Sequence, residues 1–211
     1  MTKKKWVAMG IAATLIAGAF GPSAMAATEQ VKVKVSSDSG TPAFLAGKLS
    51  SKSKASAQKV LFNYVNSHKS IFKLGNSTAE DSFSIVESTK EANGNTVLRL
   101  QQEYKGVPIW GYTQVAHINK NGELTVVSGE VAPNMDKQSK LTNAKQITGK
   151  KAVGIATAAL GLKPEYEKKP KAEKIVLMKD GEAHFAYLVT GTILLMHSQV
   201  RSSIGIMTCT K

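Results

Sequence analysis

Residues 82–104 read SFSIVESTKEANGNTVLRLQQEY, and this stretch points to a β-hairpin. Apolar and polar residues alternate on both sides of Asn93-Gly94. An Asn-Gly pair between alternating segments is the strongest short-range hairpin signal that a sequence carries. The pattern predicts two antiparallel strands, one near Ser82–Thr89 and one from Val97 to Tyr104.

Two further segments extend this hairpin into a meander. Tyr112–Asn119 and Leu124–Val131 are predicted strands, and Asn121-Gly122 between them is a second turn signal. Gly106-Val107-Pro108 is expected to force a bend, because proline cannot donate a hydrogen bond within a central sheet. The sequence therefore predicts a four-stranded antiparallel sheet.

A helix is expected before the meander. Apolar residues recur at intervals of three and four from Ala57 to Leu74, and Gly75-Asn76 is expected to end the helix. The preceding residues are polar, apart from a short Val-Lys alternation at Val31–Val35, and are interpreted as a linker. Helix and meander together make an α+β unit.

A second helix and hairpin follow after a polar connector. Thr148 is the expected helix cap and Gly161 the expected stop. Asp180-Gly181 is a turn signal between the predicted strands Ile175–Met178 and Phe185–Val189. The lysine-rich segment from Lys163 to Lys171 is interpreted as a charged loop.

The expected fold class is α+β, with two consecutive helix-plus-antiparallel-sheet units. A lone hairpin is marginally stable in water, so the second unit is expected to be incomplete and marginally folded. The expected parts are a signal peptide (1–26), a polar linker (27–54), a first unit (55–134), a connector (135–146), an incomplete second unit (147–189) and an aberrant tail (190–211).

The N-terminus has the pattern of a secretion signal. Three lysines precede an apolar run at Trp6–Phe20, and Ala24, Ala26 and Ala27 form a small-residue cleavage site. The run is shorter than the roughly 20 residues that a membrane-spanning helix needs. The sequence predicts a secreted protein that has no membrane association once the signal is removed.

The strong positive charge does not favour nucleic-acid binding. The formal net charge is +13, but arginine occurs only at Arg99 and Arg201. Nucleic-acid readers rely on arginine for bidentate contacts, whereas scattered lysines are typical of a solvated surface. Cys209 is the single cysteine, so no internal disulfide can form.

The stretch Gln101–Gly111, QQEYKGVPIWG, resembles the core of the fungalysin/thermolysin propeptide motif (FTP). Residues 114–118, Asn121-Gly122 and Ser128-Gly129 fit the same pattern, and 150–189 resembles the PepSY domain of bacillolysin-type neutral proteases. The resemblance implies a propeptide that acts as intramolecular chaperone and inhibitor of a thermolysin-like protease domain. Its alternative is a free-standing secreted inhibitor or folding helper that acts in trans.

The resemblance does not extend to a catalytic site. The zinc proteases of this family carry His-Glu-x-x-His on a helix. No histidine of this chain, at positions 68, 117, 184 and 197, is followed by glutamate. We therefore expect no catalytic residue, no metal ligand and no cofactor, because zinc and calcium would belong to the family's catalytic domain. The chain is interpreted as a truncated precursor that is not itself an enzyme.

The partner surface is expected around the motif. Tyr104, Val107, Pro108, Trp110 and Tyr112 are the candidate contact residues, because amphipathic aromatic side chains are enriched at protein interfaces. Packing of Trp110 or Tyr112 in the core is the alternative.

The tail lacks a clear periodicity, although a PepSY domain should end in two more strands. Codons permitted for residues 188–211, read two bases later, can encode a strand, a glycine turn and a strand. We interpret the tail as the product of a frameshift near Leu188, which leaves Cys209 without a designed role.

Overall fold

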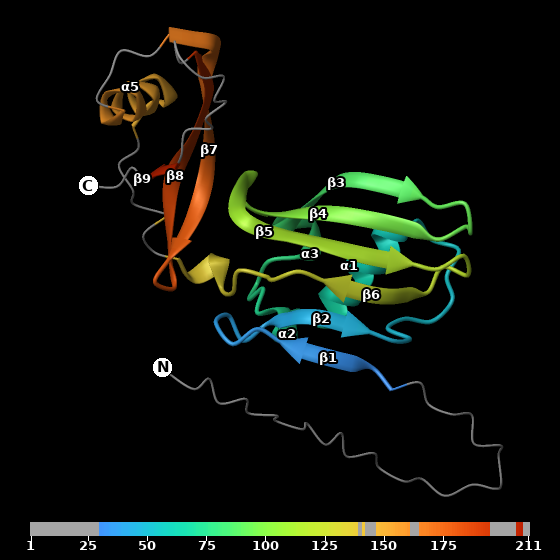
Figure 1. Cartoon of the computed structure of the whole chain (residues 1–211). Coiled ribbons are helices and arrows are strands. Elements are labelled where there is room, and N and C mark those ends of the chain that lie inside the picture. Colours follow the sequence, from blue (N-terminus) through green and yellow to red (C-terminus); the bar gives the residue numbers. More distant parts are fainter. Residues whose placement is uncertain (1–29, 139–140, 142–146, 161–164, 195–205, 209–211) are drawn as a thin grey trace, which may run out of the picture.

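A computed structural model of the chain describes residues 30–138, 141, 147–160, 165–194 and 206–208. The strands form a mixed sheet in the order β1-β2-β6-β5-β7-β8-β9, and β3 and β4 extend it from β5 (Figure 1). The strands are β1 (Lys32–Val35), β2 (Pro42–Ala46), β3 (Phe83–Lys90), β4 (Thr96–Tyr104), β5 (Val107–Ile118), β6 (Leu124–Ser128), β7 (Glu165–Lys179), β8 (Glu182–Leu194) and β9 (Ile206–Thr208).

Three of the helices lie on one face of the part of the sheet that β1–β6 form, a fourth packs on the β7–β8 hairpin, and a short 3-10 helix follows β6 near the base of that hairpin (Figure 1). They are α1 (Ala57–Ser67), α2 (Lys69–Phe72), α3 (Ala79–Ser82), a short 3-10 helix η1 (Met135–Lys137) and α5 (Gly149–Ala159). This combination of helices with a mixed, strand-rich sheet is compatible with the α+β class.

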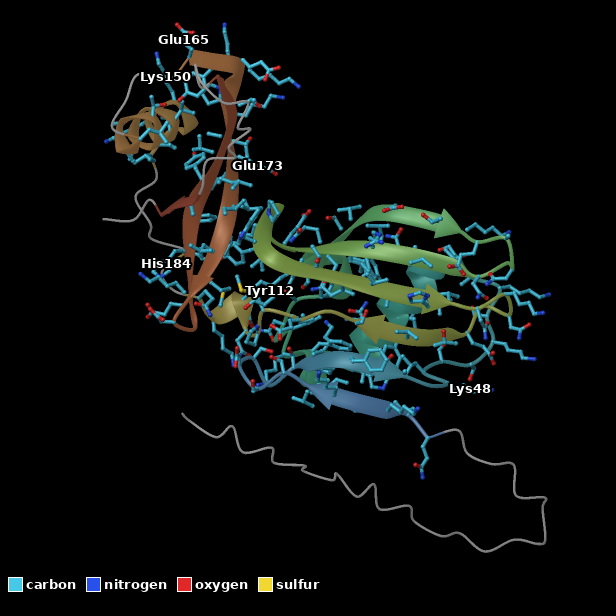
Figure 2. All side chains as sticks on the ribbon, viewed as in Figure 1. Lys48, Tyr112, Lys150, Glu165, Glu173 and His184 are labelled. Carbon is cyan, nitrogen blue, oxygen red and sulfur yellow. The ribbon has the colours of Figure 1, made fainter. Side chains whose placement is uncertain are left out.

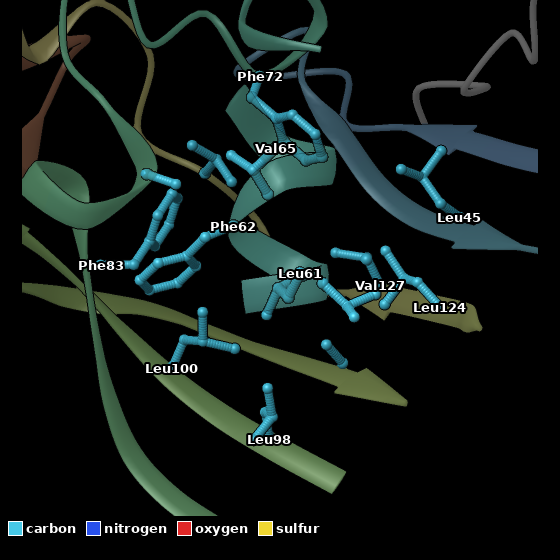
Figure 3. Close-up of a cluster of buried hydrophobic side chains, with 14 of the residues drawn as sticks. Leu45, Leu61, Phe62, Val65, Phe72, Phe83, Leu98, Leu100, Leu124 and Val127 are labelled. Carbon is cyan, nitrogen blue, oxygen red and sulfur yellow. The ribbon is translucent and has the colours of Figure 1, made fainter. Parts of the chain in front are cut away.

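The main core lies between α1 and the meander. Leu61 of α1 is 1% exposed and packs in one cluster with Leu98 and Leu100 of β4 (Figure 3). Leu45 of β2 and Phe72 of α2 are buried in the same cluster. The meander therefore buries one face and leaves the other to solvent, which explains the alternation in its sequence.

Both predicted Asn-Gly hairpins are confirmed. β3 pairs with β4 and β5 with β6, each antiparallel. In the first turn only Gly94 has a positive φ, because the chain makes a type I turn that a left-handed glycine completes. At Gly122 an added Cβ would also collide with the backbone carbonyl of Ser53, so glycine is required there for space as well as for φ.

Residues 27–54 were interpreted as a polar linker, but β1 and β2 lie within this range. The two strands pair antiparallel with each other, and β2 pairs with β6. Sequence analysis missed them because every residue of β1 is exposed and Leu45 is the fully buried anchor of β2. Backbone pairing, not an apolar face, holds β1 in place.

The first predicted helix is interrupted at His68. Ser67 donates its hydroxyl to the carbonyl oxygen of Asn63, and the His68 ring nitrogen lies 2.8 Å from the carbonyl oxygen of Tyr64. Side chains that bind these acceptors compete with the helical backbone, so α1 ends at Ser67 and α2 begins anew at Lys69.

The bend predicted at residues 106–108 is displaced. Lys105 and Gly106 both have positive φ and form a two-residue turn, so β5 begins at once with Val107, opposite Tyr104. The left-handed residue within the strand is Gly111, at φ 83°. β5 is therefore longer than predicted and reaches beyond the meander.

That extra length joins the two halves of the molecule. Ile109 pairs with Val176 of β7 in parallel, so the sheet is mixed and not wholly antiparallel. β7 also begins earlier than expected, because the predicted charged loop is strand from Glu165 onward, paired with β8 as far as Leu194. The β7–β8 turn at Asp180-Gly181 is confirmed, with positive φ at both residues.

α5 begins as predicted and packs on the β7–β8 hairpin. The Thr148 hydroxyl accepts a hydrogen bond from the backbone amide of Lys151, which caps the helix. Ala152 and Ala156 form a small cluster with Val189, whereas Ile155 is exposed. Gly161, the predicted stop, lies outside the described residues.

The tail contains structure that the sequence did not predict. β8 continues through residues 190–194, and β9 pairs antiparallel with Ala186–Leu188. The hairpin therefore has a third strand along part of its length. Cys209 lies outside the described residues.

Candidate protein-binding site

The five candidate contact residues lie where β5 leaves the meander and meets β7. Figure 2 shows Tyr112 at this junction. Tyr104 ends β4, and Val107, Pro108, Trp110 and Tyr112 lie in the first half of β5. The short turn between these strands brings all five into one region.

Three of the five turn inward. Tyr104, Val107 and Tyr112 are half-buried and pack on a second core cluster between the meander and the β7–β8 hairpin. The buried members of this cluster are Ile109, Ala132, Met135, Leu141, Val176, Ala183 and Phe185. These aromatic and branched side chains therefore hold the two halves together.

Tyr112 is a neutral packing residue. Burial raises the pKa of its phenol above the ordinary value, and the negative charges of Glu130 and Asp38 raise the pKa further. The backbone carbonyl of Tyr112 accepts a hydrogen bond from the Gln101 side chain, at 3.2 Å. Burial of its ring and this backbone hydrogen bond hold Tyr112 within the junction.

Trp110 and Pro108 remain accessible at this junction. Trp110 is 43% exposed although the adjacent Ile109 is fully buried, as expected for alternate faces of a strand. Pro108 is half-buried and lies opposite Glu103 of β4. The predicted patch therefore reduces to one exposed aromatic side chain with a proline beside it.

A cleft of about 520 Å³ opens next to Tyr104. Leu74, Met135 and Ala132 give it an apolar part, and the carboxylates of Asp81, Glu103 and Asp136 lie at its wall. The remaining lining residues are Asn76, Ser77, Ser82, Gln102, Tyr104 and Lys105. No histidine or cysteine is among the described residues that line the cleft.

Two carboxylates of the cleft have structural partners. Asp136 accepts a hydrogen bond from the backbone amide of Asn76, at 3.2 Å. Asp81 accepts from the Thr78 hydroxyl at 2.6 Å and from the Thr78 amide, which makes a capping box at the start of α3. Sequence analysis missed this cap, although Thr-x-x-Asp before Phe83 is its signal.

We expect acid to weaken the α3 cap through Asp81. The Thr78 hydroxyl, followed by the Thr78 amide, lowers the pKa of the carboxyl below its ordinary value. The stabilisation is therefore present at neutral pH and is lost as the pH falls through the folded-state pKa, below about pH 4. Asp81→Asn carries no charge at any pH, so its melting temperature should fall less between about pH 7 and about pH 3 than that of the unaltered chain. An equal fall in both proteins would contradict this role.

The described residues do not fit the zinc ion of the family's proteases. No three histidine, cysteine, aspartate or glutamate side chains in the described ranges lie close enough to hold a metal ion. Among these same residues, no helix is both long and apolar enough to cross a membrane.

The meander matches a known protein-family motif. Residues 81–131 match the Fungalysin/Thermolysin Propeptide Motif. The propeptide motif thus covers β3, β4, β5 and β6, which are the strands that the sequence predicted. It also contains Trp110 and half of the residues that line the cleft.

The chain is homologous to bacillolysins and thermolysins. It is 41% identical to bacillolysin of Bacillus cereus over 192 residues, which are 89% of this chain and 34% of that protein. It is 30% identical to the thermostable neutral protease NprT of Geobacillus stearothermophilus, over 86% of this chain and 33% of that protein. Identity to thermolysin of Alicyclobacillus acidocaldarius is 32%, over 83% of this chain and 31% of that protein. The chain spans about a third of the length of these relatives.

Proposed function

We propose that this chain is the propeptide of a secreted zinc metalloendopeptidase of the thermolysin type, and that it acts as chaperone and inhibitor of the protease domain. The observation that carries the proposal is the match of residues 81–131 to the propeptide motif. The 41% identity to bacillolysin extends the likeness beyond the motif to most of the chain.

A chaperone role has a physical basis in the fold. Secreted proteases can face high folding barriers, and a partner that binds the folding intermediate lowers them. The meander is anchored to the β7–β8 hairpin through the second core cluster, so the two halves can present one preorganised surface. Even without Lys3, Lys4 and Lys5 of the proposed signal, the chain keeps a large excess of lysine over acidic residues, which would steer it toward an acidic partner.

The remaining parts of the proposal follow from the sequence. Residues 1–26 are the secretion signal, cleaved after Ala26, and residues 147–189 are a PepSY-like unit. β7, β8 and α5 support the latter as a helix-on-sheet arrangement. Signal removal is tested by N-terminal sequencing of the exported protein, which should begin at Ala27.

Inhibition of a mature relative tests the proposed function. Purified chain, mixed with mature bacillolysin of Bacillus cereus, should abolish peptide hydrolysis at about one molecule of chain per molecule of protease. It should also raise the yield of active protease when unfolded bacillolysin is diluted into buffer. The chain alone, assayed with added zinc, is the control and should hydrolyse nothing. Full protease activity and an unchanged refolding yield at large excess of chain would overturn the proposal.

We also retain the frameshift near Leu188 as a proposal. The gene sequence tests it directly. The shifted frame should encode two strands joined by a glycine turn, followed by a protease that carries His-Glu-x-x-His. A shifted frame without these features would refute the interpretation.

A further inference from the structure

β1 is an open edge of the sheet. Among the described strands only β2 pairs with it, and all four of its residues are exposed. Four of the eight exposed large apolar side chains in the described part of the chain lie here, namely Val31 (44%), Val33 (56%), Val35 (52%) and Phe44 of β2 (37%). The apolar exposure of the molecule is therefore concentrated at this edge.

The hydrogen bonds of β2 show which backbone groups of β1 are free. Gly47 donates to Thr125, and Gly129 donates to Ala43, so the odd-numbered residues of β2 turn their backbone groups toward β6. The even-numbered residues of β2 therefore turn theirs toward β1, because these directions alternate along a strand.

On β1 the same alternation places Val33 outward. Lys34 lies opposite Phe44 and Lys32 opposite Ala46, so both lysines have their backbone groups turned to β2. The Ser36 amide also points inward, to the carbonyl of Thr41. The amide and carbonyl of Val33 point away from the sheet and are available to another strand.

The side chains of β1 divide into two faces. Val33 lies opposite Leu45, which is in the main core, so the valines project on the helix side. Lys32 and Lys34 project on the opposite face. No ion pair within the described residues involves either lysine, so both charges are available to a partner.

We propose that β1 is a docking edge, and that its occupant is an extended strand of the partner protein with apolar residues on one face and acidic residues on the other. Backbone bonds to Val33 would add the strand to the sheet, the valines would pair with its apolar side chains, and the two lysines with its carboxylates. The partner is the protease domain, and this identity rests on the proposed function.

A second copy of the chain is a poorer occupant. Two β1 strands that pair antiparallel bring side chains of the same face opposite each other, so lysine would meet lysine. Like charges directly opposite each other on a sheet are destabilising. Lys32 and Lys34 thus disfavour the pairing of two β1 strands and favour the pairing of β1 with an acidic strand.

Binding of inactivated bacillolysin to two edge variants tests the proposal. Val33→Pro removes the outward amide but leaves the inward hydrogen bonds of Lys32 and Lys34, and proline is tolerated on edge strands. We expect it to weaken binding at least about tenfold without lowering the melting temperature. Lys32→Glu with Lys34→Glu should have a similar or larger effect, because it sets acidic groups against acidic groups.

Matched controls separate the edge from general effects. Lys168→Glu with Lys169→Glu changes the net charge equally on exposed positions of β7 and should change binding less than threefold. Val33→Thr keeps the amide and the branched shape and should retain most of the affinity. Sedimentation of the chain alone should show a monomer.

The outcomes distinguish the two proposals. Binding of both edge variants with the affinity of the unaltered chain would overturn the docking edge and leave the proposed function standing. Failure of the unaltered chain to bind bacillolysin would overturn the proposed function and, with it, the partner named for the edge. A dimer that Val33→Pro abolishes would show that a second copy occupies β1 instead.

Discussion

Ile109→Ala should lower the free energy that holds the β7–β8 hairpin folded by about 2–5 kcal/mol. Ile109 is fully buried, pairs in parallel with Val176, and belongs to the cluster between the two halves of the molecule. The cavity would open where the hairpin is attached. Native-state hydrogen exchange should therefore accelerate across Ile175–Val189 while the β4 amides stay protected.

The same measurement tests the expected weakness of the second half. The cluster under α5 consists of Ala152, Ala156 and Val189, which bury little apolar area compared with the core under α1. We expect Ile175–Val189 to exchange faster than the meander even in the unaltered chain. Val86→Ala, at a side chain that is 61% exposed, is the control and should shift stability by less than about 0.5 kcal/mol. Equal protection of both halves in all three proteins would contradict the prediction.

Gln102→Leu should destabilise the meander by about 2–4 kcal/mol. Gln102 is 1% exposed, and its side chain makes two hydrogen bonds to the backbone of Ala132. The side-chain amide donates to the Ala132 carbonyl at 3.0 Å, and the side-chain oxygen accepts from the Ala132 amide at 2.7 Å. Leucine has a similar volume but would leave both backbone groups buried without a partner. Urea unfolding, followed by far-ultraviolet circular dichroism, measures the loss.

A second substitution isolates the hydrogen bonds from packing. Gln102→Glu keeps an acceptor for the Ala132 amide but removes the donor to its carbonyl. Its neutral acid form could donate again, so the variant should regain stability as the pH is lowered toward the pKa of the buried carboxyl. If Gln102→Leu were as stable as the unaltered chain, the two hydrogen bonds to Ala132 would contribute nothing measurable.

Local signals were sufficient for the meander and for the starts of α1 and α5. Asn93-Gly94 and Asn121-Gly122 predicted their hairpins because a turn depends on the φ preferences of a few adjacent residues. Thr148 predicted the start of α5 because a cap involves a hydroxyl and an amide three residues away. The match of residues 81–131 to the propeptide motif falls on this same locally encoded region.

The strands whose pairing partners lie far away in the sequence were predicted wrongly. β7 appeared as a loop up to Lys171 because its charged side chains face solvent, while its partner β8 supplies the pairing that makes it a strand. β1 and β2 were read as linker for a similar reason. Their hydrogen bonds come from each other and from β6, about 80 residues further along the chain.

The candidate binding residues show the same division. Trp110 is exposed, as a contact residue should be, whereas Tyr104, Val107 and Tyr112 pack between the two halves. Their composition suits either an external or an internal interface, since both bury aromatic and branched side chains. The sequence alone therefore does not distinguish a residue that binds a partner from a residue that packs between the two halves of the same chain.

By itself, the sequence determined the meander, its turns, the Thr148 cap of α5 and the lack of a His-Glu-x-x-His segment in these 211 residues. Each of these depends on residues a few positions apart. The tertiary structure alone decided that β5 joins both halves, that three of the five contact candidates are internal, and that β1 presents free backbone groups at an edge. Each of these depends on which distant strands pair. Every residue except proline offers the same backbone donor and acceptor, so the residues of one strand do not specify its partner, and the packing of the whole chain selects the pairing.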